Sequence, residues 1–244
     1  MSVFISKARY FRAAAASLLI LCGAALVFPQ KRNALGWTWQ NPLPQGNPLY
    51  SIHFNKDKRT GFAVGADSTV LRTEDGGFNW KTQLLPFDVT LSGVFVRDRK
   101  RAVIVGARGS IFSTDNGGAS WRQVKTESKD HLYGVTFTGE NRMTGWAVGT
   151  YGSILKTTDG GETWTVKKAD TREHLLKISA YDAGKAVIVG MNGIVLTTFD
   201  GGENWRLSKP CGNFLVSSAV FLSPEKLVAV GYGGCVAQSN DGGE

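Results

Sequence analysis

The sequence predicts an all-β fold, a β-propeller built from four-stranded antiparallel blades, with about five blades present. The first observation is a phrase of the form Thr-x-Asp-Gly-Gly-x-x-Trp that returns at intervals of 41, 43, 41 and 41 residues, read at its Asp or Asn position. A fixed period near forty residues is typical of a fold that reuses one supersecondary unit. The second observation is the set of short, β-branched runs between the phrases. The third is the composition, with 30 Gly and 11% aromatic residues, which suits many short strands and tight turns.

The chain begins with a segment that predicts export. Lys7, Arg9 and Arg12 precede an uninterrupted stretch of small and apolar residues from Ala13 to Phe28. A basic region followed by such a stretch is typical of a secretory signal. The stretch is short for a membrane span, which needs about twenty residues. Because no clean cleavage site follows it, residues 1–30 are predicted to be either a signal peptide or an N-terminal membrane anchor.

Each repeat contains four runs that predict strands. An alternating run such as Tyr50–Phe54 opens the repeat, and an apolar run ending in Gly, such as Phe62–Gly65, follows it. A third run, such as Ser110–Thr114, comes three residues later, and the Trp starts a fourth, as in Trp121–Val124. These runs are too short for helices and are bounded by turn residues. Four antiparallel strands in about forty residues describe one propeller blade.

The repeated phrase is predicted to be a structural turn and not a catalytic site. Its Asp can accept hydrogen bonds from backbone N–H groups just ahead of it, and its Gly supplies the positive φ that the turn needs. Asn116, which replaces Asp in the second copy, can make a similar turn. The Trp is large enough to fill the space between neighbouring blades. The predicted structural residues are Asp75, Trp80, Asn116, Trp121, Asp159, Trp164, Asp200, Trp205 and Asp241.

The two ends of the repeat array allow two interpretations. Trp39 lies 41 residues before Trp80, so the N-terminal part supplies the last strand of a blade. That strand either completes the fifth blade of a small closed ring, or the chain is a fragment of a larger ring. We expect the fragment, because the fifth phrase stops at Glu244 before its Trp and an open propeller exposes unpaired edges. The propeller domain is predicted to span residues 37–244.

The charge distribution and the Cys and His residues argue against a nucleic-acid-binding protein and against a metal site. The formal net charge is +8, but three of the basic residues belong to the leader, and the clusters Arg97–Arg101 and Lys167–Lys168 are interpreted as solvated loops. No nucleic-acid-binding motif accompanies them. Cys211 and Cys235 either form a disulfide or, in the case of Cys235, fill a strand position as a packed side chain. The Cys and His spacing does not fit a zinc site, so neither a metal nor a cofactor is predicted.

The phrase is the Asp box of the bacterial neuraminidase (BNR) repeat, and the chain resembles one family of BNR propellers. The unit A-V-G-x-x-G-x-I-x-x-T-x-D-G-G-x-x-W and the opening Trp39-Gln-Asn-Pro-Leu-Pro-Gln-Gly-Asn47 are similar to the photosystem II stability/assembly factor family. The resemblance covers residues 37–244. It implies a lumenal or periplasmic chaperone-like factor that binds newly made reaction-centre protein. Sialidases, xyloglucanases and sortilin-type receptors carry similar boxes.

The alternative function is a glycosidase on the same scaffold, similar to a sialidase or a xyloglucanase. Glycosidases of the common types need two carboxyl groups at the sugar. A sialidase is also expected to carry Arg-Ile-Pro near its first repeat, and that tripeptide does not occur here. The acidic residues outside the boxes lie mostly in polar, turn-like stretches. The sequence therefore favours a protein that is not an enzyme.

Candidate contact residues come from equivalent positions of the repeats. The turn after each Val-Gly carries a changing residue on a constant backbone, namely Asp67, Arg108, Tyr151, Asn192 or Gly233. A rigid scaffold with variable tips is a common recognition surface, although such tips also tolerate many residues without a function. The residue types favoured at interface hot spots select Arg108 and Tyr151, with Asn192 beside them.

Two further pairs share repeat positions. Arg72 and Lys156 occupy matching strand positions and are predicted to add a basic strip facing an acidic partner. His131 and His174 lie 43 residues apart, just before the first strand of their repeats. They are either a functional pair at the ends of two blades or separate histidines in exposed loops, and we expect the second.

Together these observations predict an exported, non-catalytic binding module, either periplasmic, lumenal or extracellular. Its expected partner is a protein or peptide client of a membrane complex, of the photosystem II type by resemblance.

Overall fold

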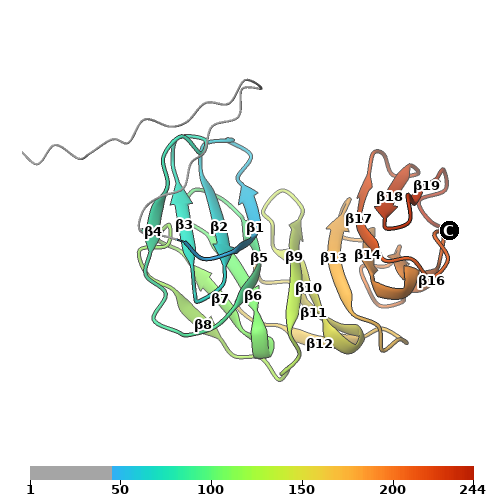
Figure 1. The fold of residues 1–244 in the computed structure, drawn as a ribbon, viewed down its shortest axis with the longest axis horizontal. Coiled ribbons are helices and arrows are strands. Elements are labelled where there is room, and N and C mark those ends of the chain that lie inside the picture. The colour runs from blue at the N-terminus through green and yellow to red at the C-terminus, as the bar shows by residue number, and fades with distance from the viewer. Residues whose placement is uncertain (1–45) are drawn as a thin grey trace, which may run out of the picture. The chain divides into compact units, whose positions relative to one another are not determined.

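The computed structural model describes residues 46–244, apart from the side chain of Lys168. The predicted leader, residues 1–30, and the predicted strand around Trp39 lie outside these residues. The described chain forms five antiparallel sheets whose strands are joined by loops and tight turns, and the described residues contain no α-helix (Figure 1). The prediction of an all-β propeller with about five blades is confirmed.

Within each sheet the strands are neighbours in chain order. Blade 1 consists of β1 (Leu49–Phe54), β2 (Gly61–Gly65), β3 (Val70–Thr73) and β4 (Lys81–Gln83). Blade 2 consists of β5 (Leu91–Val96), β6 (Ala102–Gly106), β7 (Ile111–Thr114) and β8 (Arg122–Val124). Blade 3 consists of β9 (Leu132–Thr138), β10 (Thr144–Gly149), β11 (Ser153–Thr157) and β12 (Thr165–Lys168). Blade 4 consists of β13 (Leu175–Ala180), β14 (Ala186–Gly190), β15 (Val195–Thr198) and β16 (Arg206–Ser208). Blade 5 has three described strands, β17 (Val216–Phe221), β18 (Leu227–Gly231) and β19 (Val236–Ser239).

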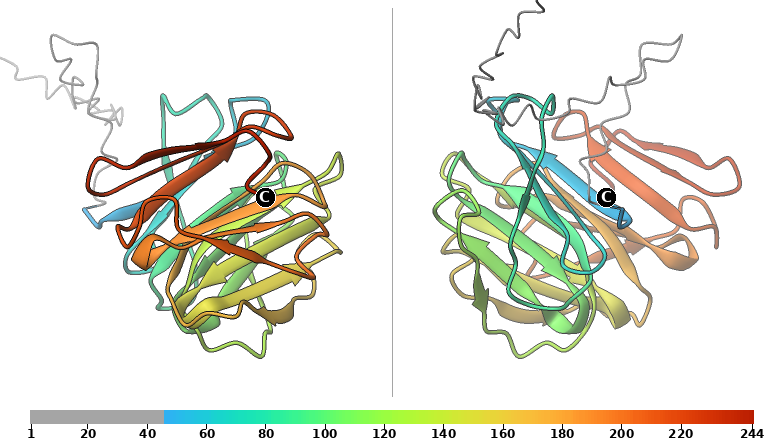
Figure 2. Two further views of the ribbon diagram at one scale, coloured as in Figure 1. Left: turned by 90° about the vertical axis from the view of Figure 1, so that its right-hand side faces the viewer. Right: turned by 60° about the vertical axis from the view of Figure 1, so that its left-hand side comes forward.

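The first strands of consecutive blades touch one another. β1 contacts β5, β5 contacts β9, β9 contacts β13 and β13 contacts β17 (Figure 2). The second strands of blades 1–4 lie behind them and are buried on both faces, as in β6, where every residue of Ala-Val-Ile-Val-Gly is buried. Burial on both faces explains why these segments read as continuous apolar runs and not as alternating ones.

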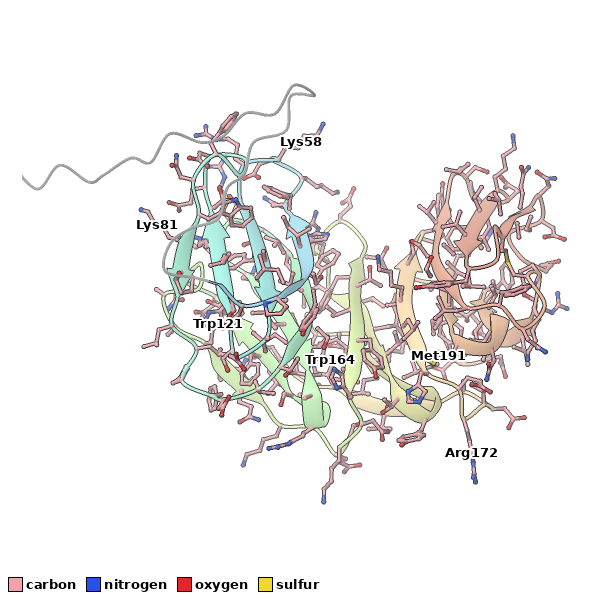
Figure 3. All side chains as sticks on the ribbon, viewed as in Figure 1. Lys58, Lys81, Trp121, Trp164, Arg172 and Met191 are labelled. Carbon is pink, nitrogen blue, oxygen red and sulfur yellow. A yellow bond between two sulfur atoms is a disulfide. The ribbon has the colours of Figure 1, made fainter. Side chains whose placement is uncertain are left out.

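Four apolar clusters lie between consecutive blades and form the core. Trp121 and Trp164 belong to the clusters between blades 1 and 2 and between blades 2 and 3, and they are only 6% and 8% exposed (Figure 3). The Trp121 ring meets Phe62 of blade 1 edge-on, with 5.7 Å between ring centroids. Trp205 packs more loosely against the cluster between blades 3 and 4. These indoles therefore fill space between blades, as the sequence pattern suggests.

The Asp boxes are hydrogen-bonded turns between the third and fourth strands. In the first box the Asp75 carboxylate accepts a hydrogen bond from the backbone N–H of Asn79 (2.9 Å) and one from its side-chain amide (2.7 Å). These bonds, followed by one from Thr73, lower the pKa of Asp75 to about 2. Asn116 makes the same turn with its amide oxygen, which accepts from the Ser120 N–H at 3.0 Å. Turn chemistry thus accounts for the Asp and Asn positions.

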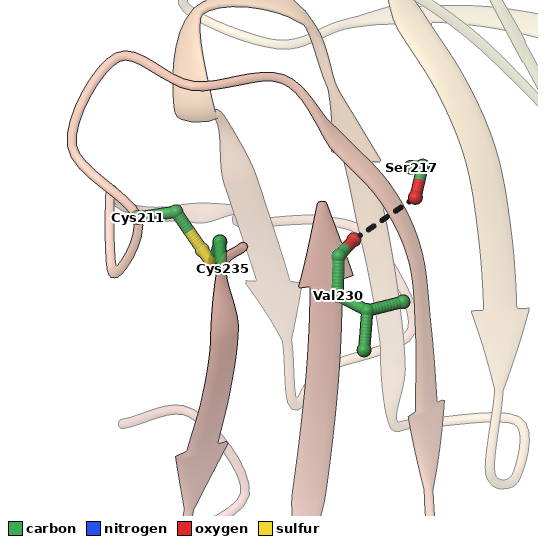
Figure 4. Close-up of a disulfide and its surroundings, with 4 residues drawn as sticks. All are labelled: Cys211, Ser217, Val230 and Cys235. Carbon is green, nitrogen blue, oxygen red and sulfur yellow. Dashed lines mark hydrogen bonds between the residues drawn. A yellow bond between two sulfur atoms is a disulfide. The ribbon is translucent and has the colours of Figure 1, made fainter. Parts of the chain in front are cut away.

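A disulfide joins Cys211 to Cys235 and resolves the alternatives that the sequence left open. Cys211 lies on the connection between blades 4 and 5, and Cys235 lies in the turn between β18 and β19 (Figure 4). Their Cα atoms are 5.7 Å apart, within the normal range for a disulfide. The bond ties the connection to the hairpin of the blade that follows it.

The described residues include no helix with the length and apolar character that a membrane crossing requires.

Candidate functional site

The blades have two chemically different ends. At one end, which we call the hairpin end, the turn between the second and third strands meets the residue that precedes the first strand, for example through the bond from the Thr150 N–H to the His131 carbonyl (2.9 Å). At the other end, the box end, each Asp box meets the loop between the first two strands, for example through the bond from the Gly160 N–H to the Met143 carbonyl (2.8 Å). The predicted contact residues divide between these two ends.

Arg108, Tyr151 and Asn192 lie at the hairpin end, each in the middle of a tight turn. The turns are η1 (Ala107–Gly109), η2 (Thr150–Gly152) and η3 (Met191–Gly193). In each turn the middle residue and the Gly after it both have positive φ, which is the geometry of a type I′ hairpin turn. The N–H of Ser110 closes the first turn onto the Ala107 carbonyl at 3.1 Å. The Gly after the tip explains why the sequence folds this way locally.

The tip residues differ in how well they tolerate this backbone. Asn192 (φ 51°, ψ 35°) is of a type that adopts the left-handed region readily. Arg108 (φ 57°, ψ 35°) and Tyr151 (φ 55°, ψ 37°) are not, and such a residue costs about 1–2 kcal/mol there. The turn chemistry itself therefore does not call for Arg or Tyr at these tips.

Four rings from blades 3 and 4 form a continuous cluster at the hairpin end. His131 stacks on Tyr133 with 4.5 Å between ring centroids, and Tyr133 meets His174 edge-on at 6.4 Å. The Tyr151 ring lies against His174 at 5.4 Å and is itself 61% exposed. We call these four residues the ring cluster. The two histidines are half-buried, so the expectation that they are exposed loop histidines is not met.

Hydrogen bonds hold the surroundings of the ring cluster in place. The Ser92 hydroxyl and His131 Nε2 are 2.7 Å apart, and burial lowers the pKa of His131. The Asn192 amide donates to the Glu173 carboxylate at 2.8 Å. Within the described residues the Arg108 guanidinium forms neither an ion pair nor a hydrogen bond, so it is available to a partner.

A bulge in the first strand of blade 3 places Tyr133 in this cluster. Leu132 pairs with Gly149 and Gly134 pairs with Val148, which leaves Tyr133 as the extra residue between them. Ser92 occupies the equivalent bulge of blade 2, between Leu91 and Gly93. Sequence reasoning missed both residues, because a bulge one residue into a strand leaves no mark in an alternating pattern.

Arg72 and Lys156 lie at the box end and do not form one surface with Arg108. Arg72 pairs with Glu74 (2.8 Å), and its guanidinium lies against Gly117 of the next blade's box. Lys156 pairs with Glu203 of the next blade's box at 3.2 Å. The structure therefore places both cations in contacts between blades, next to acidic residues of this chain.

Two buried arginines at the box end also escaped sequence analysis. Arg97 is 8% exposed, although its segment reads as a solvated charge run. Its Nε donates to the Arg142 carbonyl (2.9 Å), and Arg142 in turn donates to the Arg97 carbonyl (2.6 Å). The two guanidiniums stack on Phe137 and Phe95, respectively. This reciprocal pair joins the loops of blades 2 and 3, and only its burial distinguishes it from a surface cluster.

His53 of blade 1 packs on the same region. Its Nδ1 accepts a hydrogen bond from the backbone N–H of Val96 at 3.0 Å, and its ring lies 4.2 Å from that of Phe95. Burial, and then the charge of Arg142, lower the pKa of His53 to about 4. His53 is therefore neutral at neutral pH and serves as an acceptor between blades 1 and 2.

The described residues contain no group of three or more His, Cys, Asp or Glu side chains placed to hold a metal ion. The box carboxylates are occupied as hydrogen-bond acceptors in turns, as shown for Asp75. The guanidinium of Arg108 and the exposed ring of Tyr151 make the hairpin end of blades 2–4 the candidate site.

Comparisons with known proteins agree with this architecture. The YCF48 structure from Cyanidioschyzon merolae is 19% identical, with a TM-score of 0.60, and the match covers 84% of this chain and 86% of that one. The GH74 enzyme of Niastella koreensis is 15% identical, with a TM-score of 0.66, covering 80% of this chain and 37% of the enzyme. A structure described as YCF48 bound to D1 peptide is 19% identical, with a TM-score of 0.47, covering 83% and 80%. At these identities the likeness concerns the fold. No curated protein matches the sequence.

The family comparison is more specific than the structural one. The model of the family described as photosynthesis system II assembly factor YCF48 matches residues 31–129 and again residues 119–210. The two matches together cover more than half of the chain and include the turns that carry Arg108 and Tyr151. The family resemblance predicted from the repeats is confirmed, and the chain belongs to the photosystem II assembly factor YCF48 family.

Proposed function

We propose that this protein is an exported, non-catalytic binding module that holds a protein or peptide client of a membrane complex at the hairpin end of its blades. The observation that carries the proposal is the pair of tips Arg108 and Tyr151. Both are exposed, both occupy the equivalent position of neighbouring blades, and both sit in a backbone conformation that disfavours them. Backbone strain of this kind concentrates at functional sites. Membership of an assembly factor family supports a protein client.

The scaffold suits this function because its hairpin end is rigid. Each tip is closed by a backbone hydrogen bond and rests on the segment before a first strand, as the bond from Ala107 N–H to the Thr90 carbonyl (2.9 Å) shows. A preorganised surface loses little conformational entropy on binding. The free guanidinium of Arg108 suits a carboxylate of the client, since Arg binds planar anions through paired hydrogen bonds.

Export is part of the same proposal. The disulfide between Cys211 and Cys235 supports an oxidising compartment, where such bonds persist. Residues 1–30 then act as the signal peptide or anchor, and the binding domain begins near residue 37. N-terminal sequencing of the mature protein from a periplasmic or lumenal fraction tests this part. A protein recovered only in the reducing cytosol, with its cysteines free, contradicts it.

The client-binding part is tested by capture from host membranes with the full chain, followed by titration of a D1 peptide of the kind that one YCF48 structure contains. We expect recovery of one membrane-complex subunit and loss of most of it with Arg108→Glu. Lys81→Glu is the matched control, because Lys81 is an exposed cation on β4 of blade 1 (Figure 3). Equal capture by the Arg108 variant removes the site. Hydrolysis of xyloglucan by the purified chain, without client capture, would favour the glycosidase alternative.

A further inference from the structure

We propose that the ring cluster is a subsite that receives one aromatic side chain of an extended, non-basic client segment, with Tyr151 as its platform. This inference rests on the proposed function and adds to it the side-chain chemistry that the client must present. It concerns Tyr151 and His174, and Arg108 enters only as one of two cations that lie at the same end of the blades.

The fold does not need Tyr at position 151. The equivalent tips of blades 4 and 5 are Asn192 and Gly233, the residue types that a type I′ turn prefers. Tyr151 instead carries the cost of a left-handed backbone and keeps most of its ring in solvent. An exposed aromatic residue held in a backbone conformation that is unfavourable for its type indicates a contact outside the chain.

The exposed ring of Tyr151 is already held in place by its neighbours. Tyr151 lies against His174, which meets Tyr133, which stacks on His131. The Ser92 hydroxyl contacts His131 Nε2 at the far end of this row. A ring supported in this way loses little freedom when a partner covers its open face, and aromatic pairs in tilted or offset geometry attract each other beyond simple burial.

The surroundings of the Tyr151 ring suit an aromatic side chain better than a sugar. Beside the ring, Asn192 donates to Glu173 and His131 is engaged by Ser92, whereas His174 Nδ1 has no partner among the described residues but is buried away from solvent. A sugar needs accessible hydrogen-bonding groups around the ring on which it stacks, whereas the ring of a Phe, Tyr or Trp side chain does not.

The charged residues at the hairpin end further restrict which client side chain can bind at Tyr151. Arg108 lies on the neighbouring hairpin, and Arg172 follows Thr171, whose carbonyl lies against Gly152 in the Tyr151 turn. Among the described residues neither guanidinium has an ion-pair partner, and Arg172 extends away from the blades (Figure 3). The carboxylate of Glu173 lies at the same end but already accepts a hydrogen bond from Asn192, so the two cations without a partner disfavour a Lys or Arg side chain over Tyr151. They favour an aromatic side chain with acidic or neutral neighbours.

The experiment uses acetylated and amidated tripeptides Asp-Xaa-Asp, with Phe, Trp, Leu or Lys in the middle, titrated into the full chain. NMR of the aromatic side chains reports binding at Tyr151 and His174. We expect the Phe and Trp probes to shift these resonances and the Leu and Lys probes to bind at least fivefold more weakly. Equal binding of the Leu probe, or shifts elsewhere only, would overturn the proposal.

Variants separate the ring from the turn. Tyr151→Asn keeps a residue that suits the backbone and should abolish the preference for aromatic probes, whereas Tyr151→Phe should retain it. Tyr181→Asn is the control, since Tyr181 is also exposed but follows β13 at the box end. Unchanged selectivity in Tyr151→Asn contradicts the subsite, and so does a xyloglucan oligosaccharide that binds at Tyr151 in place of the aromatic probes. A client captured without tripeptide selectivity refutes the subsite alone, whereas tripeptide selectivity without any client refutes the proposed function alone.

Discussion

Replacing Trp121 with Ala tests whether the Asp-box Trp holds neighbouring blades together. Trp121 is 6% exposed and belongs to the cluster shared by blades 1 and 2, where its ring meets Phe62 edge-on. A buried aromatic side chain covers about 150–250 Å². At about 25 cal/mol per Å² this burial contributes roughly 4–6 kcal/mol, an upper value because the unfolded chain is already partly compact.

Two further contributions to the change in the free energy of unfolding act in opposite directions. Loss of the edge-on contact with Phe62 adds about 0.5–1.5 kcal/mol to the damage. The buried Nε1 of Trp121 has no hydrogen-bond partner in the structure, so its removal relieves about 1–3 kcal/mol. The apolar term is the larger one, and the net expectation for Trp121→Ala is a loss of about 3–5 kcal/mol in the free energy of unfolding.

The assay is urea unfolding followed by far-UV circular dichroism, because the other six Trp residues obscure a fluorescence signal. Trp121→Phe is the matched control. It keeps an aromatic ring and removes the unpartnered N–H, so its loss should be well under half of that of Trp121→Ala. A Trp121→Ala variant within about 1 kcal/mol of the parent would refute the reasoning, because a well-buried aromatic side chain cannot be removed so cheaply.

Three other predictions follow from single contacts. The free energy of unfolding should fall by up to about 3 kcal/mol as the pH drops from 7 to 4, because the folded-state pKa of His53 is lowered to about 4 and the unfolded chain takes up the proton first. Urea titrations at several pH values should show this fall, and a His53→Asn variant with the same dependence on pH would contradict the assignment to His53. Tyr151→Asn should raise the thermal midpoint, since Asn suits the left-handed backbone better by about 1 kcal/mol; a lower midpoint would mean that the contact with His174 outweighs the strain. Reducing the Cys211–Cys235 bond, which joins residues 24 apart in sequence, should lower the free energy of unfolding by roughly 3 kcal/mol. Amide hydrogen exchange should then rise in blade 5 before it rises in blade 2, and a uniform rise would show that the bond does not act locally.

The fold was readable from the sequence because its period and its turn chemistry are local. The Asp at 75 specifies its turn through residues a few positions away, the Trp at 121 recurs at a fixed place in the repeat, and the buried strands show as apolar runs ending in Gly. The tips were also identifiable, because a Gly follows Arg108 and Tyr151 in the same place of each repeat. Local patterns of this kind carry the strand and turn assignments.

The rest depends on contacts between blades, which no local pattern records. Arg72 reads as a free cation on its strand, but the neighbouring box and Glu74 occupy it. Arg97 reads as part of a solvated run, but the loop of the next blade buries it through carbonyl groups some 45 residues away in sequence. Long-range burial decides whether a basic residue is a surface charge or a structural contact. Sequence alone therefore overestimated the basic surface at the box end.

At the hairpin end, where we propose that the client binds, a change of tip residue leaves the contacts between blades intact, which a change at the box end does not. At the box end, a change at Gly160 meets the Arg97 guanidinium, and a change at Lys156 meets the carboxylate of Glu203, so each substitution there disturbs a contact between blades. At the hairpin end the turn is closed by its own backbone, and the tip side chain can vary among Arg, Tyr and Asn without altering the hydrogen bonds. The cost of an unfavourable tip residue is confined to its own φ and ψ angles and stays near 1–2 kcal/mol. The tips of such a propeller can therefore change one blade at a time, as they do here between Arg108, Tyr151 and Asn192.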